Sequence, residues 1–228
     1  MDVLLSLLSD FGFERLSSEL TLPIVIHSVP GGGKSSLIRA LINKDKRFAA
    51  FTFGKEDCEN ITGVRIKKVP EVLQQIEFAL FDEYLEGAVP TWAFAVFADP
   101  LQGGPGTVRR AHFIKRKSHR FGKCTAQLLT ELGYAVEAEG NDVLQIQGLY
   151  DAEPQGTVLF YEPEVGELLR QHSVPAYCIS EIRGQSFTSV TFVTGESYPV
   201  DRALAFQCLT RHCSSLLILC PNATYTTA

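Results

Sequence analysis

The chain has 228 residues, of which 45% are hydrophobic and 21% are charged, and its formal net charge is −5. This composition is typical of a globular protein with one large domain or two small ones, and it excludes a disordered chain. The negative net charge argues against non-specific nucleic-acid binding by the whole surface, although a local basic groove is compatible with it.

Neither the cysteine spacing nor the hydropathy indicates a zinc protein or a membrane-spanning protein. The six cysteines form no C-x-x-C pair, and no histidine spacing is typical of a zinc site, so we expect free thiols in a reducing cytosol. No apolar run reaches the roughly 20 residues that a transmembrane helix needs. The leucine-rich residues 3–8 lack the basic region of a signal peptide and predict a helical turn packed on the body of the protein.

A glycine-rich loop, residues 28–35, follows an apolar run at residues 23–26 and precedes a helix-like run at residues 36–42. The order of strand, glycine turn and helix predicts a loop that binds the phosphates of a nucleotide. Glycines allow backbone N–H groups to surround a phosphate, and the positive end of the helix faces the same anion. Ser28 stands where the pattern G-x-x-x-x-G-K-[ST] has its first glycine, and we expect the turn to survive because serine is small.

The side chains of this loop have separate expected roles. Lys34 would reach the β- and γ-phosphates, and the Ser35 hydroxyl would ligand Mg²⁺. The alternative is a glycine-rich turn with a surface lysine at the start of a helix. The expected nucleotide-binding residues of the loop are Pro30, Gly31, Gly32, Gly33, Lys34, Ser35 and Ser36.

The segment after the loop helix is rich in turn-forming residues. Residues 47–54 predict a strand that ends in glycine, residues 64–66 a short strand, and residues 70–75 a turn of helix. This pattern indicates a largely irregular connection to the next motif.

An apolar run at residues 78–81 leads directly into Asp82 and Glu83. Such a run is typical of a buried parallel strand, and ligand sites of open α/β sheets lie at the carboxyl edge, where these acids would stand. Asp82 would hold Mg²⁺, directly or through water, and Glu83 would orient and deprotonate the attacking water. The alternative is an acidic pair at a helix start, but the phosphate loop upstream favours the catalytic interpretation.

A second buried strand, residues 92–98, ends in Asp99, Pro100 and, two residues later, Gln102. Gln102 would lie at the same sheet edge, where it could hydrogen-bond the γ-phosphate or its attacking water. A turn built on Asp99 and Pro100 is the alternative, and the two interpretations are compatible.

A glycine-rich break at residues 103–106 predicts a link or mobile loop, and the densest basic stretch follows it, from Arg109 to Lys123. Phe113 and Phe121 are interleaved with the basic residues. Basic residues combined with aromatic residues are typical of a groove that binds single-stranded nucleic acid. A solvated charged face is the alternative.

A second series of helices and strands follows this stretch. Alternation through both halves of the chain predicts two parallel α/β lobes, at residues 1–108 and 109–228. The expected elements of the second series are helices at residues 123–132, 164–172 and 200–211 and strands at residues 143–147, 157–161, 176–180, 190–193 and 216–220.

The order of these motifs resembles the superfamily 1 RNA helicases of positive-strand RNA viruses. More narrowly, the whole chain is similar to the first triple-gene-block movement proteins of plant carlaviruses and potexviruses. The segments that carry the resemblance are residues 28–35, Phe81–Tyr84, Phe97–Gln102, Ser118–Arg120, Arg183–Phe187 and Leu209–His212, which together span residues 28–212.

The resemblance implies two RecA-like P-loop NTPase lobes that bind ATP or another NTP with Mg²⁺. It implies that Arg120 and Arg211 of the second lobe face the bound triphosphate, where planar guanidinium groups suit the charge on a transferring phosphoryl group. It also implies that residues 51–54 touch RNA and that Gly184 lies near RNA or the γ-phosphate. The expected catalytic residues are therefore Lys34, Glu83, Gln102, Arg120 and Arg211, and the expected metal ligands are Ser35 and Asp82.

The activity implied by the resemblance is NTP hydrolysis coupled to movement of viral single-stranded RNA. It would serve transport from cell to cell through plasmodesmata and suppression of host RNA silencing. The implied partners are viral RNA, further copies of the chain, other viral movement proteins and coat protein, in the host cytoplasm. A rival interpretation is an RNA- and protein-binding silencing suppressor whose NTPase is only a conformational switch. A phosphoryl-transfer kinase is a third and less favoured interpretation.

Overall fold

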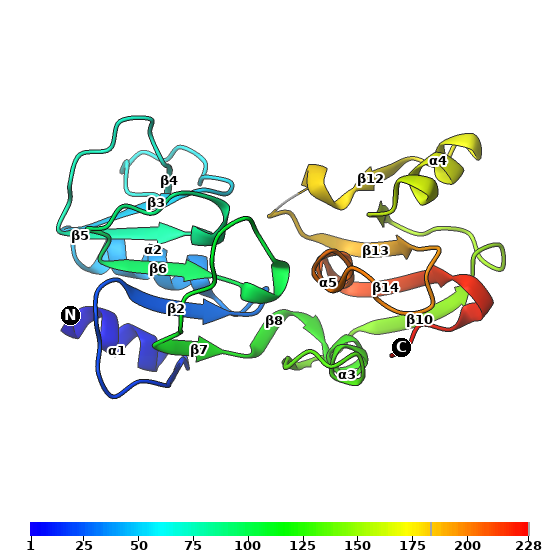
Figure 1. Cartoon of the computed structure of the whole chain (residues 1–228), viewed down its shortest axis with the longest axis horizontal. Coiled ribbons are helices and arrows are strands. Elements are labelled where there is room, and N and C mark those ends of the chain that lie inside the picture. Colours follow the sequence, from blue (N-terminus) through cyan, green and yellow to red (C-terminus); the bar gives the residue numbers. More distant parts are fainter. Residues whose placement is uncertain (183, 228) are drawn as a thin grey trace. The chain divides into compact units, whose positions relative to one another are not determined.

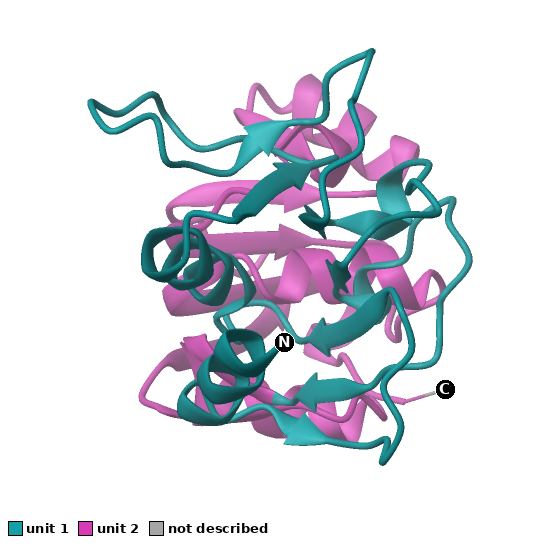
Figure 2. Ribbon diagram, turned by 90° about the vertical axis from the view of Figure 1, so that its left-hand side faces the viewer, with its two compact units in different colours: residues 1–116 teal, residues 117–228 magenta. Residues whose placement is uncertain are grey.

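The computed structural model describes residues 1–182 and 184–227 and divides into two compact units, residues 1–116 and 117–228 (Figure 2). Each unit contains a mainly parallel sheet with helices, which confirms the predicted α/β class. The sequence places the division earlier, between residues 108 and 109. The structure keeps residues 109–116 with the first unit because the strand β7 (Phe113–Lys115) pairs with β2 (Ile24–Ser28).

The first unit is built on a seven-stranded sheet of order β1-β7-β2-β6-β5-β3-β4. All neighbouring pairs are parallel except β1 with β7. The remaining strands are β1 (Glu14–Arg15), β3 (Phe48–Thr52), β4 (Lys67–Lys68), β5 (Phe78–Asp82) and β6 (Ala95–Ala98), and the helices are α1 (Asp2–Asp10) and α2 (Lys34–Lys44), with short 3₁₀ turns η1 (Tyr84–Glu86) and η2 (Pro100–Gln102).

Side chains of the first sheet alternate between two hydrophobic clusters, as the two-residue period of a strand requires. Ile24 and Ile26 of β2 pack with the buried leucines of α1 and α2, whereas Val25 between them packs in the opposite cluster. Figure 2 shows both helices on one side of this sheet. On the other side, η1 and the loops that carry Phe53 and Trp92 replace helices, so this face is closed by irregular chain.

The second unit contains a five-stranded, fully parallel sheet of order β10-β14-β13-β11-β12 and a separate pair, β8 with β9 (Figure 1). α4 packs on the face formed by Val158, Val193, Leu217 and Leu219. The strands are β8 (Lys117–Gly122), β9 (Glu137–Gly140), β10 (Val143–Gly148), β11 (Thr157–Phe160), β12 (Ala176–Cys178), β13 (Phe187–Val193) and β14 (His212–Cys220), and the helices are α3 (Lys123–Glu131), α4 (Pro163–Gln171) and α5 (Arg202–Leu209), with turns η3 (Ile179–Ile182) and η4 (Pro221–Ala223).

Three local predictions differ from the structure. Residues 64–66 are not a strand, since β4 comes one residue later, and residues 70–75 contain no helical turn. The basic stretch forms the strands β7 and β8, which its sequence did not predict. β4 and β7 are short strands defined by their pairing partners, which local periodicity cannot reveal.

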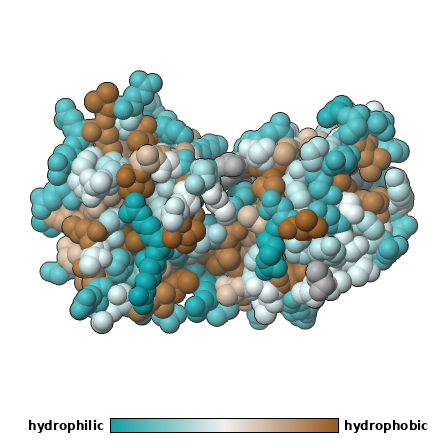
Figure 3. All heavy atoms as spheres, in the orientation of Figure 1, coloured by the Kyte–Doolittle hydropathy of each residue, from teal (hydrophilic) through white to brown (hydrophobic). Residues whose placement is uncertain are grey.

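Figure 3 shows hydrophobic and hydrophilic residues interspersed over both units on the face that it presents. The most exposed large hydrophobic side chains of the first unit, Ile61 and Val72, lie in the irregular chain around β4. Among residues 1–182 and 184–227, no helix has the length and apolarity needed to cross a bilayer.

Gly122 allows the backbone at Asn141 and Asp142 to approach the start of α3 closely. Its position has no room for a Cβ, which would lie 2.6 Å from the backbone of Asn141 and Asp142. Asp142 in turn caps α3, because its carboxylate accepts hydrogen bonds from the backbone N–H groups of Cys124 (2.9 Å) and Thr125 (3.2 Å). The cap depends on the close approach that a glycine permits.

We expect Gly122→Ala to lower the free energy of unfolding by about 1–3 kcal/mol, as overpacking against backbone does. Thermal and chaotrope unfolding measure the loss. Gly140→Ala is the matched control, because Gly140 pairs with Gly122 but its Cβ would have no neighbour closer than 3.9 Å. Equal stability of the two variants would contradict the interpretation.

Candidate nucleotide-binding site

The phosphate loop has the backbone that its sequence predicts. β2 is buried throughout and delivers the loop to the carboxyl edge of the sheet, and α2 starts at Lys34. Gly31 and Gly33 have φ angles of 72° and 95°, in the left-handed region that residues with side chains rarely adopt. Lys34 is buried, and its Nζ donates a hydrogen bond to the backbone oxygen of Ser28 at 2.9 Å. The lysine therefore lies folded over the loop.

Ser28 and Gly32 fit one another, which accounts for the serine that departs from the usual pattern. A Cβ on Gly32 would lie 2.6 Å from Ser28 Oγ and 3.0 Å from Ser28 Cβ. Ser28 is buried, and its hydroxyl donates to the Val29 carbonyl at 3.1 Å. The serine side chain thus occupies the space beside Gly32, and the loop keeps its course only because residue 32 lacks a side chain.

The phosphate loop also contacts Lys115 of β7 and Phe11 of the N-terminal segment. Lys115 Nζ donates to the backbone oxygen of Phe11 at 2.8 Å. A Cβ on Gly33 would lie 3.7 Å from the Phe11 ring and 4.0 Å from Lys115 Nζ. The backbone N–H of Val29 donates to the Lys115 carbonyl at 3.1 Å, so the start of the loop continues the sheet.

Asp82 ends β5 next to the first turn of α2. Ser35 Oγ donates to Asp82 Oδ2 at 3.4 Å, so the two expected metal ligands lie together. Burial and the neighbouring Glu83 carboxylate raise the pKa of Asp82, while the Lys34 charge and the Ser35 hydrogen bond act in the opposite direction. A hydroxyl and a carboxylate beside a phosphate loop are hard oxygen donors, and this donor set fits Mg²⁺.

Glu83 directly follows the strand and has a left-handed backbone, with φ of 53°. Its N–H donates to Asp82 Oδ1 at 3.1 Å, and its carbonyl accepts from the Glu86 N–H at 3.0 Å. A non-glycine residue in this region carries strain of roughly 1 kcal/mol or more, which the surrounding contacts must hold.

Asp99 lies at the candidate site, although its sequence predicts only a turn with Pro100. It follows β6 and is buried, and it accepts hydrogen bonds from Leu101 N and from Gln102 Nε2, each at 3.0 Å. Burial raises the pKa of Asp99 to about 6, an effect that the Lys34 charge partly offsets. Asp99 therefore orients the amide of Gln102. The charge of Lys34 acts on the carboxyl groups of both Asp82 and Asp99. The signal available in the sequence was an acid directly after a buried strand.

A hydrogen-bonded chain fastens the turn η1 behind these acids. The Tyr84 hydroxyl lies 2.9 Å from His27 Nε2 and accepts from the Arg109 backbone N–H at 3.0 Å. Burial and the nearby Lys34 charge lower the pKa of His27 to about 4, so the imidazole is neutral at pH 7. A neutral ring has one donor and one acceptor nitrogen, so the tautomer of His27 sets the direction of its hydrogen bond with the Tyr84 hydroxyl.

The expected residues of the second unit gather at the amino ends of β13 and β14. An Arg120 guanidinium nitrogen donates to the Thr210 carbonyl at 3.3 Å, and Arg211 is buried with a guanidinium nitrogen 3.4 Å from Gln207 Oε1. The Phe187 N–H donates to the Arg211 carbonyl at 2.8 Å, which brings the two motifs together. Gly184 is exposed with φ of 74°, and Arg183 lies outside the described residues.

The aromatic part of the predicted nucleic-acid groove is wrong. Phe113 and Phe121 are only 4% and 2% exposed, so neither ring can stack on a base. Several basic neighbours also have local partners, since His112 Nδ1 accepts from Val25 N at 2.9 Å and Arg116 lies 3.7 Å from a Glu14 carboxylate oxygen. The composition of the stretch reflects short strands with one buried face.

These features define a P-loop NTPase fold with helicase motifs, and the comparisons with known proteins agree. The family model of the viral superfamily 1 RNA helicase core domain matches residues 24–220. The solved complex of the Arterivirus nonstructural protein 10 helicase with DNA has a TM-score of 0.63 at 17% identity, covering 86% of this chain and 60% of that one. A second solved structure of the Arterivirus nonstructural protein 10 helicase has a TM-score of 0.56 at 19% identity, over 96% of this chain and 56% of that one. This chain thus spans a little over half the length of those helicases and shares their fold.

Full-length relatives specify the family. The movement and silencing protein TGBp1 of Lily symptomless virus is 77% identical over 226 residues, and that of Chrysanthemum virus B is 50% identical over 229 residues, with 99% of each chain covered in both cases. The TGBp1 of Poplar mosaic virus is 43% identical over 231 residues. The chain belongs to the TGBp1 family of movement and silencing proteins, built on a viral superfamily 1 RNA helicase core.

The fit between Ser28 and Gly32 predicts an interaction between two substitutions. We expect Gly32→Ala to weaken nucleotide binding by about tenfold or more, because the added methyl group collides with Ser28 Oγ and moves the loop. Removing the serine side chain opens this space, so Ser28→Gly should restore part of the affinity in the double variant. Titration with a fluorescent nucleotide analogue gives the four dissociation constants. Additive losses would contradict the fit.

Proposed function

We propose that the chain hydrolyses ATP or another NTP, with Mg²⁺, on the first unit, and that RNA stimulates this reaction. The observation that carries the proposal is the meeting of Ser35 and Asp82, 3.4 Å apart, beside the buried Lys34 at the carboxyl edge of one sheet. A hydroxyl, a carboxylate and an ammonium group at a glycine loop are the groups that a metal-bound triphosphate requires.

Each residue of the site has a role that follows from its place. Lys34 exchanges the Ser28 carbonyl for phosphate oxygens, and Ser35 and Asp82 hold the metal, which neutralises charge on the phosphates when bound. Glu83 accepts the proton of the attacking water. Asp99 holds the amide of Gln102, which orients that water or contacts the γ-phosphate. The loop from Pro30 to Ser36 supplies backbone N–H groups.

For the second unit we propose that Arg120 and Arg211 stabilise the charge on the transferred phosphoryl group. One support is the family to which the chain belongs. The other is the hydrogen bond from Arg120 to the carbonyl of Thr210, the residue before Arg211. Two guanidinium groups are suited to equatorial phosphoryl oxygens because they are planar and permanently charged. Gly184 belongs to the adjacent motif, and we assign it to contact with RNA or the nucleotide.

At the level of the virus, we propose that this activity moves viral single-stranded RNA from cell to cell through plasmodesmata and that the protein suppresses host RNA silencing. The support is the 77% identity to a protein named for movement and silencing. We also propose self-association, contact with other viral movement proteins and coat protein, and a location in the host cytoplasm.

The second candidate is an RNA- and protein-binding suppressor in which hydrolysis only switches conformation. It is favoured by the name of the 77% identical relative, which gives silencing alongside movement. A strand-displacement assay distinguishes the two. Phosphate release without duplex separation supports the switch, and RNA binding that persists in a hydrolysis-defective variant separates suppression from a motor.

Lys34→Ala should abolish RNA-stimulated phosphate release, because the ammonium group that contacts the phosphates and compensates two buried carboxylates is lost. Lys44→Ala is the matched control, since Lys44 lies exposed in the last turn of the same helix. Phosphate release is measured for both with and without single-stranded RNA. Unchanged release by Lys34→Ala would overturn the proposed site.

Arg120→Ala and Arg211→Lys should each lower kcat by on the order of 10³-fold with little change in nucleotide affinity, as loss of an arginine that acts on the transition state does. Arg170→Ala, on an exposed face of α4, serves as the control. Thermal unfolding of each variant shows whether the fold is retained. A loss confined to nucleotide affinity would assign these arginines to binding alone.

A further inference from the structure

The side chain of Glu83 rests on the backbone of Gly54. A Cβ on Gly54 would lie 3.3 Å from Glu83 Cγ and 3.4 Å from Thr52 Oγ1. The 3.3 Å separation is tighter than nine in ten contacts of real Cβ atoms, so an alanine at residue 54 requires Glu83 Cγ to give way by a few tenths of an ångström. Glycine is therefore the residue that leaves Glu83 its place at the carboxyl edge.

The backbone of Glu83 has little freedom to compensate for such a push. Its N–H is bonded to Asp82 and its carbonyl to Glu86, and its φ of 53° is already unfavourable for a residue with a side chain. The position of the carboxylate is consequently set by what its side chain packs against.

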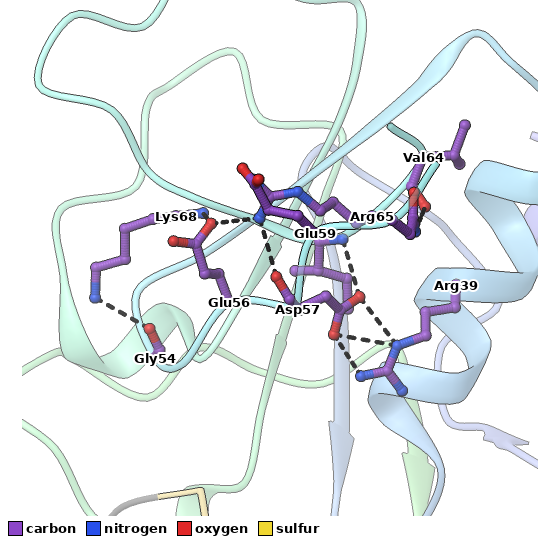
Figure 4. A network of polar contacts seen from close by, with 10 residues as sticks. Arg39, Gly54, Glu56, Asp57, Glu59, Val64, Arg65 and Lys68 are labelled. Atoms are coloured by element: carbon purple, nitrogen blue, oxygen red, sulfur yellow. Dashed lines mark hydrogen bonds and ion pairs between the residues drawn. The ribbon is translucent and has the colours of Figure 1, made fainter. Parts of the chain in front are cut away.

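Gly54 is itself held in place from two sides. Lys68 Nζ donates to the carbonyl oxygens of Phe53 and Gly54, each at 3.0 Å, and the Gly54 N–H donates to Thr52 Oγ1 at 2.9 Å. Figure 4 shows the long side chain of Lys68 reaching Gly54. The Phe53 ring stacks on Phe81 with centroids 6.2 Å apart, so the residue next to Gly54 packs on the strand that ends in Asp82.

The same polar network extends to the helix of the phosphate loop. Arg39 of α2 forms an ion pair with Asp57 at 2.6 Å, and Asp57 accepts from the Ile66 N–H at 3.1 Å. Arg65 pairs with Glu56 at 2.7 Å, and Glu56 accepts from the Lys68 N–H at 3.3 Å (Figure 4). The connection between β3 and β4 is thus held to α2 through Asp57 and to β4 through Gly54, whose carbonyl accepts from Lys68.

We propose that Gly54 and Lys68 are positioning residues for Glu83: the lysine fixes the backbone of residues 53–54, and this backbone sets where the carboxylate stands. The inference rests on the proposed function, because it requires that Glu83 act on water. In this inference both residues act on hydrolysis through the glutamate, and neither is assigned a contact with the nucleotide or the metal.

The variants Gly54→Ala, Gly54→Val and Lys68→Met test this inference, with Gly140→Ala and Lys67→Met as matched controls. Lys67 is the neighbouring exposed residue of β4, and Gly140 has room for a methyl group. We expect kcat for phosphate release to fall about 3–10-fold in Gly54→Ala and Lys68→Met and further in Gly54→Val, because a displaced catalytic group loses rate steeply with distance. Nucleotide affinity, KM and the unfolding temperature of Gly54→Ala and Lys68→Met should stay near wild-type values.

A double-variant cycle with Glu83→Gln separates positioning from a structural role. If Gly54 acts through Glu83, Gly54→Ala should cause no further loss of kcat in the Glu83→Gln background. Additive losses, or wild-type kcat in both Gly54→Ala and Lys68→Met, overturn the inference while wild-type hydrolysis leaves the proposed function standing. A wild-type chain that releases no phosphate overturns both. If Gly54→Ala fails to fold, the same cycle with Lys68→Met decides.

Discussion

The candidate site depends on three neighbouring parallel strands that end at the same edge of one sheet. β6 lies between β2 and β5, with His27 opposite Ala98 and Asp82 opposite Phe97. This register delivers the phosphate loop, the acidic pair and the Asp99 turn to one place. It also buries two carboxylates, and the positive charge of Lys34 opposes the effect of burial on both. The lysine therefore contributes to the electrostatic balance of the unliganded protein, in addition to the role in nucleotide binding proposed for it.

Much of the first unit could be predicted because its informative residues are tied to strand ends. A buried apolar run followed at once by a polar residue locates that residue at a sheet edge, and this reasoning places Asp82 at the edge where the phosphate loop lies, in agreement with its hydrogen bond from Ser35. The α/β class of both units followed from alternation of strand and helix patterns, and the family model and full-length relatives confirm the family suggested by motif order.

The rest depended on contacts between residues far apart in the chain, which local patterns do not contain. Composition indicated exposed aromatic residues in the basic stretch, but pairing of β7 with β2 turns Phe113 into the core. The irregular residue of the phosphate loop, Ser28, became interpretable only with the space beside Gly32 known. The packing of Gly54 on Glu83 likewise joins two segments whose sequences give no sign of each other.

The support that Lys115 and Phe11 give to the phosphate loop makes the beginning of the chain a mechanical part of the nucleotide site. Leu4 and Leu8 of α1 pack in the same hydrophobic cluster as Leu37 of α2, the helix that follows the phosphate loop. The N-terminal helix and the loop helix are therefore parts of one core. Proteolytic removal of the first eleven residues would act on nucleotide affinity through lost packing and the lost hydrogen bond between Phe11 and Lys115, with every residue of the phosphate loop still present. The N-terminal helix thus supports the candidate nucleotide site, although it contributes no side chain to it.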